Sequence, residues 1–370
     1  MTTNRRKFLS TGIGAGVAGL ALGAPAIVQA QSSQTFNWKM TSAYPKGSPF
    51  YMDGPGSATD LAKRIGEMSN GRLKIQVFGA GELIPAFEGF DAVRSGTVEM
   101  NHANSYFWTG KTFAAQYFTA VPFGLNYQGM NGWLYDGGGI DLWNEVYAPF
   151  GMVAMPCGNT GVQMTGWFKK KINSVADLKG LKMRIPGLGG RLFSAVGAVP
   201  QQIPGGDIYP ALEKGTIDAA EWIGPHDDEK LGLYKVAPNY YFPAWWEPST
   251  QFSVMINKKE WDKLPKNYQQ ILEVAAAETN VRMLAEYDFR NPTALAKLQK
   301  GGAKLSAFSN EIMEASFKAT NEVLEETAAK NPDFKKIYEP WRQFRNLEFQ
   351  WFNVTEQAYA KFAFSKKLGK

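Results

Sequence analysis

Two segments of the 370-residue chain repeat one short pattern. Residues 92–99 read AVRSGTVE and residues 211–218 read ALEKGTID, so each ends a helical stretch at a glycine and continues with threonine, an apolar residue and an acid. The two glycines, Gly96 and Gly215, are separated by about 120 residues, which is too long for a solenoid repeat. The pattern favours two lobes built alike, and the alternative is a chance match between two helix ends.

The repeat also predicts where a ligand would bind. After each glycine we expect the chain to enter a strand whose far end faces the crevice between the lobes, because open α/β sheets bind ligands at such strand ends. These ends are residues 101–104 and 221–224.

Periodicity along the chain is typical of an α/β fold. Alternating apolar residues over 36–40 and 73–77 predict two strands, with a helical pattern over 58–68 between them. Strand patterns recur, separated by helical patterns, at 152–155, 163–168, 182–185 and 252–256. The fold class that this alternation predicts is α/β.

A long helix is predicted from Pro265 to Asn291, where Pro292 follows. At about 1.5 Å per residue it would be a rod of roughly 40 Å, long enough to lie across both lobes. The remaining segments are also helical, with apolar stripes at Met313, Phe317, Leu324 and Ala328, and at Phe334, Ile337, Trp341, Phe344, Trp351, Val354 and Ala358.

The last predicted helix is apolar on a second side. Phe349, Phe352 and Tyr359 lie off its main stripe. A helix that is apolar on two sides needs two partners, so the second side either meets another subunit or is buried under a loop of the same chain.

The N-terminus is typical of an export signal. Residues 4–10 read NRRKFLS, and a glycine-rich, mildly apolar stretch and a small-residue end at Ala30 follow. We expect residues 1–30 to be a twin-arginine-type signal peptide, with an ordinary secretory leader as the alternative, and the mature chain to begin near Gln31 in the periplasm. Later apolar stretches are interrupted, so no transmembrane helix is expected.

The residue inventory excludes several classes of function. The apolar fraction of 44% excludes a disordered chain. A single cysteine, Cys157, forms no intrachain disulfide, and His102 and His226 leave little imidazole for metals or catalytic triads. Half of the formal net charge of +6 lies in the leader, and the other basic residues are scattered, so no nucleic-acid partner is expected.

Polar groups beside aromatic residues gather in the second half of the chain. Arg184 lies in KMRIPG, and its planar guanidinium fits a carboxylate with two parallel hydrogen bonds. The alternative is a buried ion pair with Glu221 or Glu247. Gln163 lies in GNTGVQMTGWF and Trp222 in AAEWIGP, at strand ends or in loops.

The two glutamates imply a bound cation. Glu221 and Glu247 stand beside tryptophans, and a buried carboxylate must be paired, protonated or metal-bound. If both face Arg184 and a monocarboxylate ligand, the negative charges outnumber the positive one. Na⁺ or Ca²⁺, hard ions that prefer oxygen ligands, would compensate.

These motifs resemble those of the solute-binding proteins of tripartite ATP-independent periplasmic (TRAP) transporters, of DctP type. The similarity extends over nearly all of the mature region, and the segments GNTGVQMTGWF, KMRIPG, VPQQIPGGDIYPALEKGTIDAAEWIGPHDDEKLG and YYFPAWWE are similar to the branch that binds 2-oxo or 2-hydroxy monocarboxylates with a cation. The resemblance implies a two-lobed fold with a long helix spanning both lobes. The lobes would be 31–158 plus 249–283, and 159–248 plus 284–370.

The resemblance also implies roles for single residues. Arg184 would pair with the ligand carboxylate and Gln163 would be a polar contact. Glu221, the Trp222 carbonyl and Glu247 would hold the cation. Tyr106 and its neighbours Asn104 and Phe107 would supply contacts from the first lobe, where the family varies most, and Trp222, Trp245 and Trp246 would form a wall of the cleft or belong to the core.

The mechanism implied is binding without turnover. The lobes would close on a small carboxylate and present it to membrane subunits, and a homodimer through the C-terminal helix is implied by the same branch. The alternative class is an exported enzyme acting on small organic acids. The sequence disfavours an enzyme because it offers no nucleotide loop, haem motif or general base.

Overall fold

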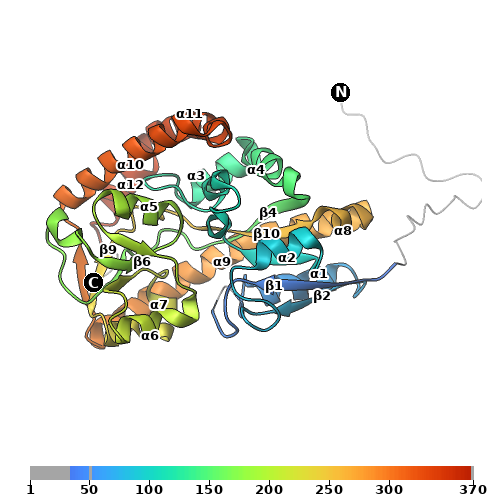
Figure 1. Cartoon of the computed structure of the whole chain (residues 1–370), viewed down its shortest axis with the longest axis horizontal. Helices are drawn as coiled ribbons and strands as arrows, with labels where there is room; N and C mark the ends of the chain where they lie inside the picture. The colour runs from blue at the N-terminus through green and yellow to red at the C-terminus, as the bar shows by residue number, and fades with distance from the viewer. Residues whose placement is uncertain (1–33, 50–51, 368–370) are drawn as a thin grey trace, which may run out of the picture. The chain divides into compact units, whose positions relative to one another are not determined.

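The computed structural model describes residues 34–49 and 52–367 (Figure 1). The predicted signal peptide, residues 1–30, lies outside these ranges. In the described part of the chain, strands form two sheets. The order of the first is β2 (Leu73–Phe78), β1 (Phe36–Ser42), β3 (Met100–Ala103), β10 (Gln251–Asn257), β4 (Met152–Asn159). The order of the second is β7 (Val199–Gln201), β6 (Lys182–Arg184), β8 (Ala219–Ala220), β5 (Gly166–Phe168), β9 (Asn239–Phe242), β11 (Lys304–Ala307).

The two sheets follow one plan. In the first sheet, β2, β1 and β3 are parallel, β10 is antiparallel to β3, and β4 is antiparallel to β10. In the second, β7, β6 and β8 are parallel, β5 is antiparallel to β8, and β9 is antiparallel to β5. The α/β fold class with two similarly built halves is therefore confirmed. The lobe boundaries given above stay a prediction.

The repeated helix ends explain part of this plan. Helix α2 (Gly89–Ser95) ends at Gly96 and α6 (Ile208–Glu213) ends just before Gly215. Both glycines adopt the left-handed conformation, with φ of 78° and 77°. That conformation is accessible to glycine at little cost and turns the chain out of the helix. The strands that follow, β3 and β8, occupy corresponding places in their sheets.

The long helix α9 (Lys266–Lys300) runs further than predicted. It packs against β4 and α1 (Ala58–Met68) of the first half and against α7 (Pro225–Leu231) of the second. Pro292 lies inside it, so the predicted end at Asn291 is wrong. Proline has no N–H to donate to the carbonyl four residues earlier, which is that of Asp288. Because Asp288 and Pro292 are both exposed, water can donate a hydrogen bond to this carbonyl instead.

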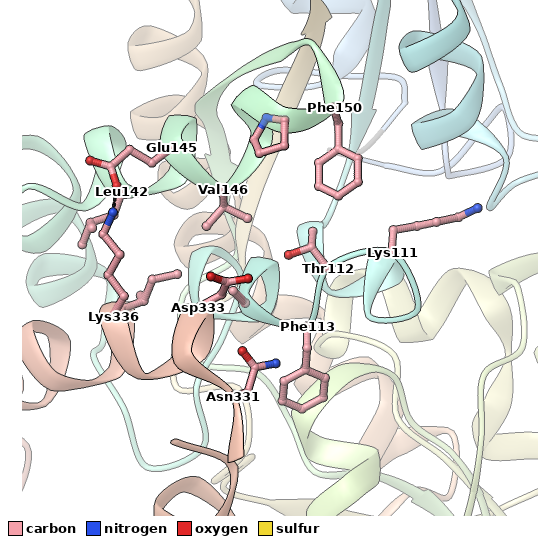
Figure 2. Close-up of a pocket in the computed structure, with 13 residues that line it drawn as sticks. Lys111, Thr112, Phe113, Leu142, Glu145, Val146, Phe150, Asn331, Asp333 and Lys336 are labelled. Atoms are coloured by element: carbon pink, nitrogen blue, oxygen red, sulfur yellow. Dashed lines mark hydrogen bonds and ion pairs between the residues drawn. The ribbon is translucent and has the colours of Figure 1, made fainter. Parts of the chain in front are cut away.

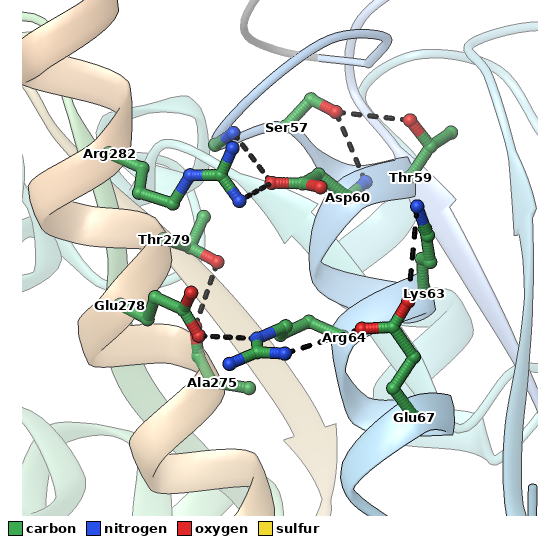
Figure 3. Close-up of polar contacts among 11 residues, drawn as sticks. Ser57, Thr59, Asp60, Lys63, Arg64, Glu67, Ala275, Glu278, Thr279 and Arg282 are labelled. Atoms are coloured by element: carbon green, nitrogen blue, oxygen red, sulfur yellow. Dashed lines mark hydrogen bonds and ion pairs between the residues drawn. The ribbon is translucent and has the colours of Figure 1, made fainter.

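Helices α1 and α9 are joined by two ion pairs that cross between them (Figure 3). Arg64 Nε lies 2.7 Å from Glu278 Oε2, and Arg282 Nη1 lies 3.1 Å from Asp60 Oδ2. These side chains are partly exposed, so each pair contributes about 1 kcal/mol or less. Backbone contact is a stronger constraint, because a Cβ at Gly56 would lie 2.5 Å from the Met283 nitrogen.

Replacing Gly56 with alanine is expected to destabilise the fold by roughly 1 to 3 kcal/mol, since the added methyl group overpacks against the backbone of α9. The φ of Gly56 is +72°, which adds backbone strain. Gly47→Ala is the matched control, because its φ is +85° and nothing lies within 4 Å of the added Cβ. Equal free energies of unfolding for the two variants, from urea titrations, would contradict the expected packing effect.

Three helices end the described chain: α10 (Asn310–Lys330), α11 (Pro332–Val354) and α12 (Glu356–Ala363). Phe334, Ile337 and Trp341 are buried as predicted. The rest of both stripes is partly wrong, since Phe317 is 41% exposed, Trp351 61% and Val354 68%. Periodicity shows which residues share a helix face, but it does not show whether the same chain covers that face.

The exposed apolar residues of α11, α12 and the residue that follows form a set that we call the C-terminal apolar surface: Leu347, Phe349, Trp351, Val354, Tyr359, Phe362 and Phe364. Across the described ranges, the helices are either too short or too polar to cross a bilayer.

Candidate functional site

Arg184 ends β6, and its side chain is 3% exposed. Its Nε donates to the Ile203 carbonyl at 3.0 Å. Its Nη1 donates to the Glu221 carbonyl at 3.2 Å and forms an ion pair with Glu221 Oε1. The buried ion pair that the sequence left open as an alternative is therefore present in this structure. A ligand carboxylate would compete with Glu221 for the same guanidinium.

Glu221 follows directly after β8 and is completely buried. One carboxylate oxygen pairs with Arg184, whereas Oε2 is buried with no hydrogen-bond partner. Burial raises the pKa of Glu221 well above its usual value, and the nearby Arg184 opposes this only in part. The free oxygen is therefore suited to a proton or to a metal ion.

Glu247 is the second buried carboxylate of the site. Its Oε2 accepts a hydrogen bond from Thr250 Oγ1 at 3.1 Å. Burial raises the pKa of Glu247 to about 7, and Arg184 lowers it in part. Two carboxylates share one guanidinium, so full ionisation leaves one buried negative charge without compensation.

The donor set fits a hard cation that completes its shell with other oxygens. Among the described residues, no group of three or more His, Cys, Asp or Glu side chains could hold a metal. Backbone carbonyls, amide oxygens or a ligand would therefore have to complete the shell around two carboxylates. Ca²⁺ and Na⁺ accept such mixed oxygen ligands.

Gln163 lies just before β5, not inside a strand as predicted, because β5 begins only at Gly166. Its backbone N–H donates to the Glu247 carbonyl at 3.2 Å. Its Nε2 lies 2.9 Å from Thr250 Oγ1 and 3.2 Å from Thr160 Oγ1. The Oε1 atom is buried and has no hydrogen-bond partner. Gln163 thus lies beside Glu247, and its predicted contact with a ligand stays a prediction.

Aromatic residues from the first half of the chain approach this group. Tyr106 lies in η1 (Ser105–Trp108) and packs closely on Gly187, which begins α5 (Gly187–Ala195). A Cβ added to Gly187 would lie only 2.9 Å from the Cβ of Tyr106. Burial raises the pKa of Tyr106 well above 10. The negative charges of Glu247 and Glu221 also raise this pKa, and the positive charge of Arg184 lowers it. Tyr106 therefore lies close to the predicted site.

Tyr44 is a site neighbour that the sequence analysis missed. It follows β1, and its ring centroid lies 6.3 Å from that of Trp222. Its hydroxyl donates to Asn104 Oδ1, and Asn104 Nδ2 donates to the Gln251 carbonyl at 2.9 Å. Because β1 and β3 are parallel neighbours, their ends meet at one edge, and applying the strand-end rule to β1 would have found Tyr44.

The tryptophans divide into two groups. Trp222 lies beside Arg184, with the guanidinium carbon 5.2 Å from its ring centroid. Trp245 stacks on Phe193 with centroids 5.5 Å apart, and Trp246 meets Phe193 edge-on at 4.8 Å. Trp245 and Trp246 therefore belong to the core of the second half, which was the alternative interpretation of these residues.

A separate cavity of about 370 Å³ lies between η2 (Phe113–Phe118), α4 (Gly139–Tyr147) and the start of α11 (Figure 2). Its two lysines are already paired, Lys111 with Asp91 at 2.6 Å and Lys336 with Glu145. It includes none of the predicted site residues. The lysines of this cavity are also exposed to solvent, whereas the charges around Arg184 are buried, so the group around Arg184 is the stronger candidate for a ligand site.

Comparisons with known proteins show which family the chain is similar to. The chain matches the family model described as "Bacterial extracellular solute-binding protein, family 7" over residues 54–331. A protein of Nostoc sp. (strain PCC 7120) named monocarboxylate 2-oxoacid-binding periplasmic protein is 46% identical over 98% of this chain and 100% of its own length.

Solved structures of TRAP transporter solute-binding proteins are also similar. The one from Bordetella bronchiseptica, a dimer with copurified calcium and picolinate, is 49% identical with a TM-score of 0.86, covering 90% of this chain and 98% of its own. The one from Pseudoalteromonas atlantica, with bound sodium and pyruvate, is 39% identical with a TM-score of 0.86, covering 89% and 99%. The one from Colwellia psychrerythraea, with calcium and pyruvate, is 41% identical with a TM-score of 0.85, covering the same shares.

Proposed function

We propose that this chain, which belongs to bacterial extracellular solute-binding protein family 7, captures a 2-oxo or 2-hydroxy monocarboxylate together with a cation in the periplasm. The closed complex then delivers the acid to TRAP membrane subunits. One observation carries the proposal: a buried guanidinium is paired with one buried carboxylate, that of Glu221, and a second buried carboxylate, that of Glu247, lies near enough for its pKa to feel the same charge. Such a group needs additional positive charge, and it offers a planar fork for a carboxylate.

The roles divide between an anion contact and a cation contact. Arg184 binds the carboxylate of the ligand, and Gln163, Tyr106 and Trp222 bound the space around it. Glu221, Glu247 and the Trp222 carbonyl hold Na⁺ or Ca²⁺, which supplies positive charge between these oxygens and those of the ligand. The buried Oε2 of Glu221, which has no hydrogen-bond partner, supports this assignment. Pyruvate with sodium or calcium in the similar proteins supports the ligand class.

Binding without turnover fits the reactive side chains. His102 is buried, and burial lowers its pKa to about 3, so it is neutral and shielded from solvent. Cys157 is buried, and burial raises the pKa of its thiol far above the usual range, which disfavours the nucleophilic thiolate. The proposal is therefore a binding protein and not an exported enzyme acting on small organic acids.

Ligand capture would close two lobes. We assign 31–158 plus 249–283 to the first and 159–248 plus 284–370 to the second, in keeping with the two sheets. The contacts of Tyr44 with Trp222 and of Tyr106 with Gly187 then join one lobe to the other beside Arg184. A ligand that contacts both lobes binds the closed state more tightly and so shifts the population toward it.

A homodimer would use the C-terminal apolar surface. Trp351, Val354 and Phe362 are each more than half exposed, and large apolar side chains gathered on one part of a protein mark an interaction site. The Bordetella protein is described as a dimer, which supports the same assembly here.

Thermal unfolding of the purified protein tests the proposed function. Pyruvate at one hundred times its dissociation constant, with calcium or sodium present, is expected to stabilise the fold by about 2.7 kcal/mol. Pyruvate in buffer stripped of both ions should stabilise it less, and the acid should be recovered unchanged. Absence of a shift with any short oxo or hydroxy acid would contradict binding, and consumption of the acid would support the enzyme.

A further inference from the structure

We propose that Thr160 and Thr250 are positioning residues that hold the amide oxygen of Gln163 toward the cation and ligand. All three residues are buried. Thr160 directly follows β4 and Thr250 directly precedes β10, so the threonines lie where the chain leaves the first sheet and returns to it. The Thr160 N–H donates to the Thr250 carbonyl at 3.3 Å, which ties the two segments together.

Each threonine hydroxyl has a single proton, and both protons are already committed. Thr250 Oγ1 donates to Glu247 Oε2 at 3.1 Å. Thr160 Oγ1 donates to the Gly161 carbonyl at 3.1 Å. A carbonyl oxygen only accepts hydrogen bonds, so the Thr160 proton is committed whatever the state of Glu247, and a carboxylate that holds a cation commits the Thr250 proton in the same way. Toward Gln163, both hydroxyls therefore present lone pairs.

The side-chain nitrogen of Gln163 donates a hydrogen bond to each of these two hydroxyl oxygens. Nε2 carries two protons and faces two acceptors, at 2.9 Å and 3.2 Å. The flipped amide would place its oxygen against two other acceptors, so the hydroxyl protons fix the orientation of the group. The Oε1 atom consequently points away from the threonines, where it is buried without a hydrogen-bond partner.

This orientation sets what kind of ligand the site accepts. Oε1 of Gln163 and Oε2 of Glu221 are both buried oxygens that lack a donor. An amide oxygen coordinates Na⁺ or Ca²⁺ and accepts a hydrogen bond from a 2-hydroxy group, whereas an NH₂ group in its place would repel the cation. The two hydroxyls thus favour an acid bound with a cation over an acid bound alone. This consequence rests on the proposed function, whereas the amide orientation does not.

Thr160→Val is the cleanest test, because it removes one acceptor of the Gln163 amide and leaves the bond from Thr250 to Glu247 in place. Thr250→Val removes the other acceptor, and Thr250→Ser restores it. Thr320→Val is a matched control, since this buried hydroxyl on α10 donates to the Ser316 carbonyl at 2.7 Å. Calorimetry measures calcium affinity with pyruvate present. NMR on protein with ¹⁵N-labelled glutamine measures exchange of the Gln163 side-chain protons, assigned with Gln163→Met.

Both valine variants at positions 160 and 250 are expected to weaken calcium binding about threefold to tenfold, the range for one lost hydrogen bond. Thr250→Ser and Thr320→Val should stay within about twofold of the wild type. The side-chain amide protons should exchange slowly in the wild type and faster in Thr160→Val. Unchanged exchange in Thr160→Val would overturn the inference. Slow exchange in a wild-type protein that binds no cation would overturn the proposed function instead.

Discussion

Replacing Arg184 with alanine is expected to weaken pyruvate binding by roughly 2 to 5 kcal/mol, the range for truncating one partner of a buried charge pair. Each 1.4 kcal/mol is about a tenfold change in the dissociation constant. The guanidinium is almost fully buried, so removing it leaves the ligand carboxylate without this charged hydrogen-bond donor in a site that holds little water. Arg184→Lys should lose less, because it keeps the charge but not the planar fork. Calorimetry with pyruvate in calcium buffer measures both variants.

Calcium binding without pyruvate separates this role from a damaged fold. Arg184→Ala removes a positive charge beside Glu221 and Glu247, so calcium should bind at least as tightly as it does to the wild type. Lys182→Ala is the matched control, because it removes one positive charge from an exposed position on the same strand. Pyruvate affinity within threefold of the wild type in Arg184→Ala, or an equal loss in Lys182→Ala, would contradict the assignment.

The residues that carry charge could be predicted from the sequence. Arg184, Glu221 and Glu247 stand out because a charged residue beside tryptophans must find a partner when it is buried. The structure brings these three together and places Trp222 against the guanidinium. The helix-stop repeat likewise predicted the shared plan of the two sheets, because a left-handed glycine has a local physical cause that the sequence displays.

The uncharged neighbours of the site could not be predicted in the same way. Thr160 and Thr250 matter through the direction of single hydrogen bonds, and these depend on which segments meet in three dimensions. The strand-end rule could have located Tyr44, but its contact with Trp222, far away in the sequence, forms only across the two halves of the chain. Threonine is also common in ordinary turns, so its presence alone indicates no role.

The errors in the predicted helices have a related origin. A proline ends a helix when the carbonyl four residues earlier finds no other hydrogen-bond donor. On α9 both Asp288, which carries this carbonyl, and Pro292 are exposed, so water can donate to the carbonyl and the helix continues. The stripes on α10 and α11 follow the helical period correctly, yet Phe317, Trp351 and Val354 remain exposed. In both cases the local pattern correctly predicts a helix. Where that helix ends and which of its residues are buried depend on the solvent and on the segments that pack against it.

Without a bound cation, the protein is expected to lose stability as the pH rises from about 4.5 to about 7. Burial raises the pKa of Glu247 from its usual 4.5 to about 7 and also raises that of Glu221 well above its usual value. The folded state therefore holds more protons than the unfolded state in this window, and the free energy of unfolding must fall with increasing pH. The stabilisation is complete below about pH 4.5 and is lost as the pH rises through the pKa of the folded state, a change of a few kcal/mol.

A cation should reverse this trend, because it binds the ionised carboxylates and competes with the proton. Calcium affinity is therefore expected to rise with pH across the same window, and saturating calcium should flatten the stability curve. Three other buried groups add slopes that do not respond to calcium: Asp228, whose pKa burial raises to about 6, and Asp227, whose pKa burial also raises, make stability fall with pH, whereas His102, whose pKa burial lowers to about 3, opposes them. Glu247→Gln should remove the calcium-dependent part, whereas Glu322→Gln, at an exposed position on α10, should retain it. Urea unfolding at several pH values, with and without calcium, measures both parts. A wild-type slope that calcium leaves unchanged would place Glu221 and Glu247 outside any cation site.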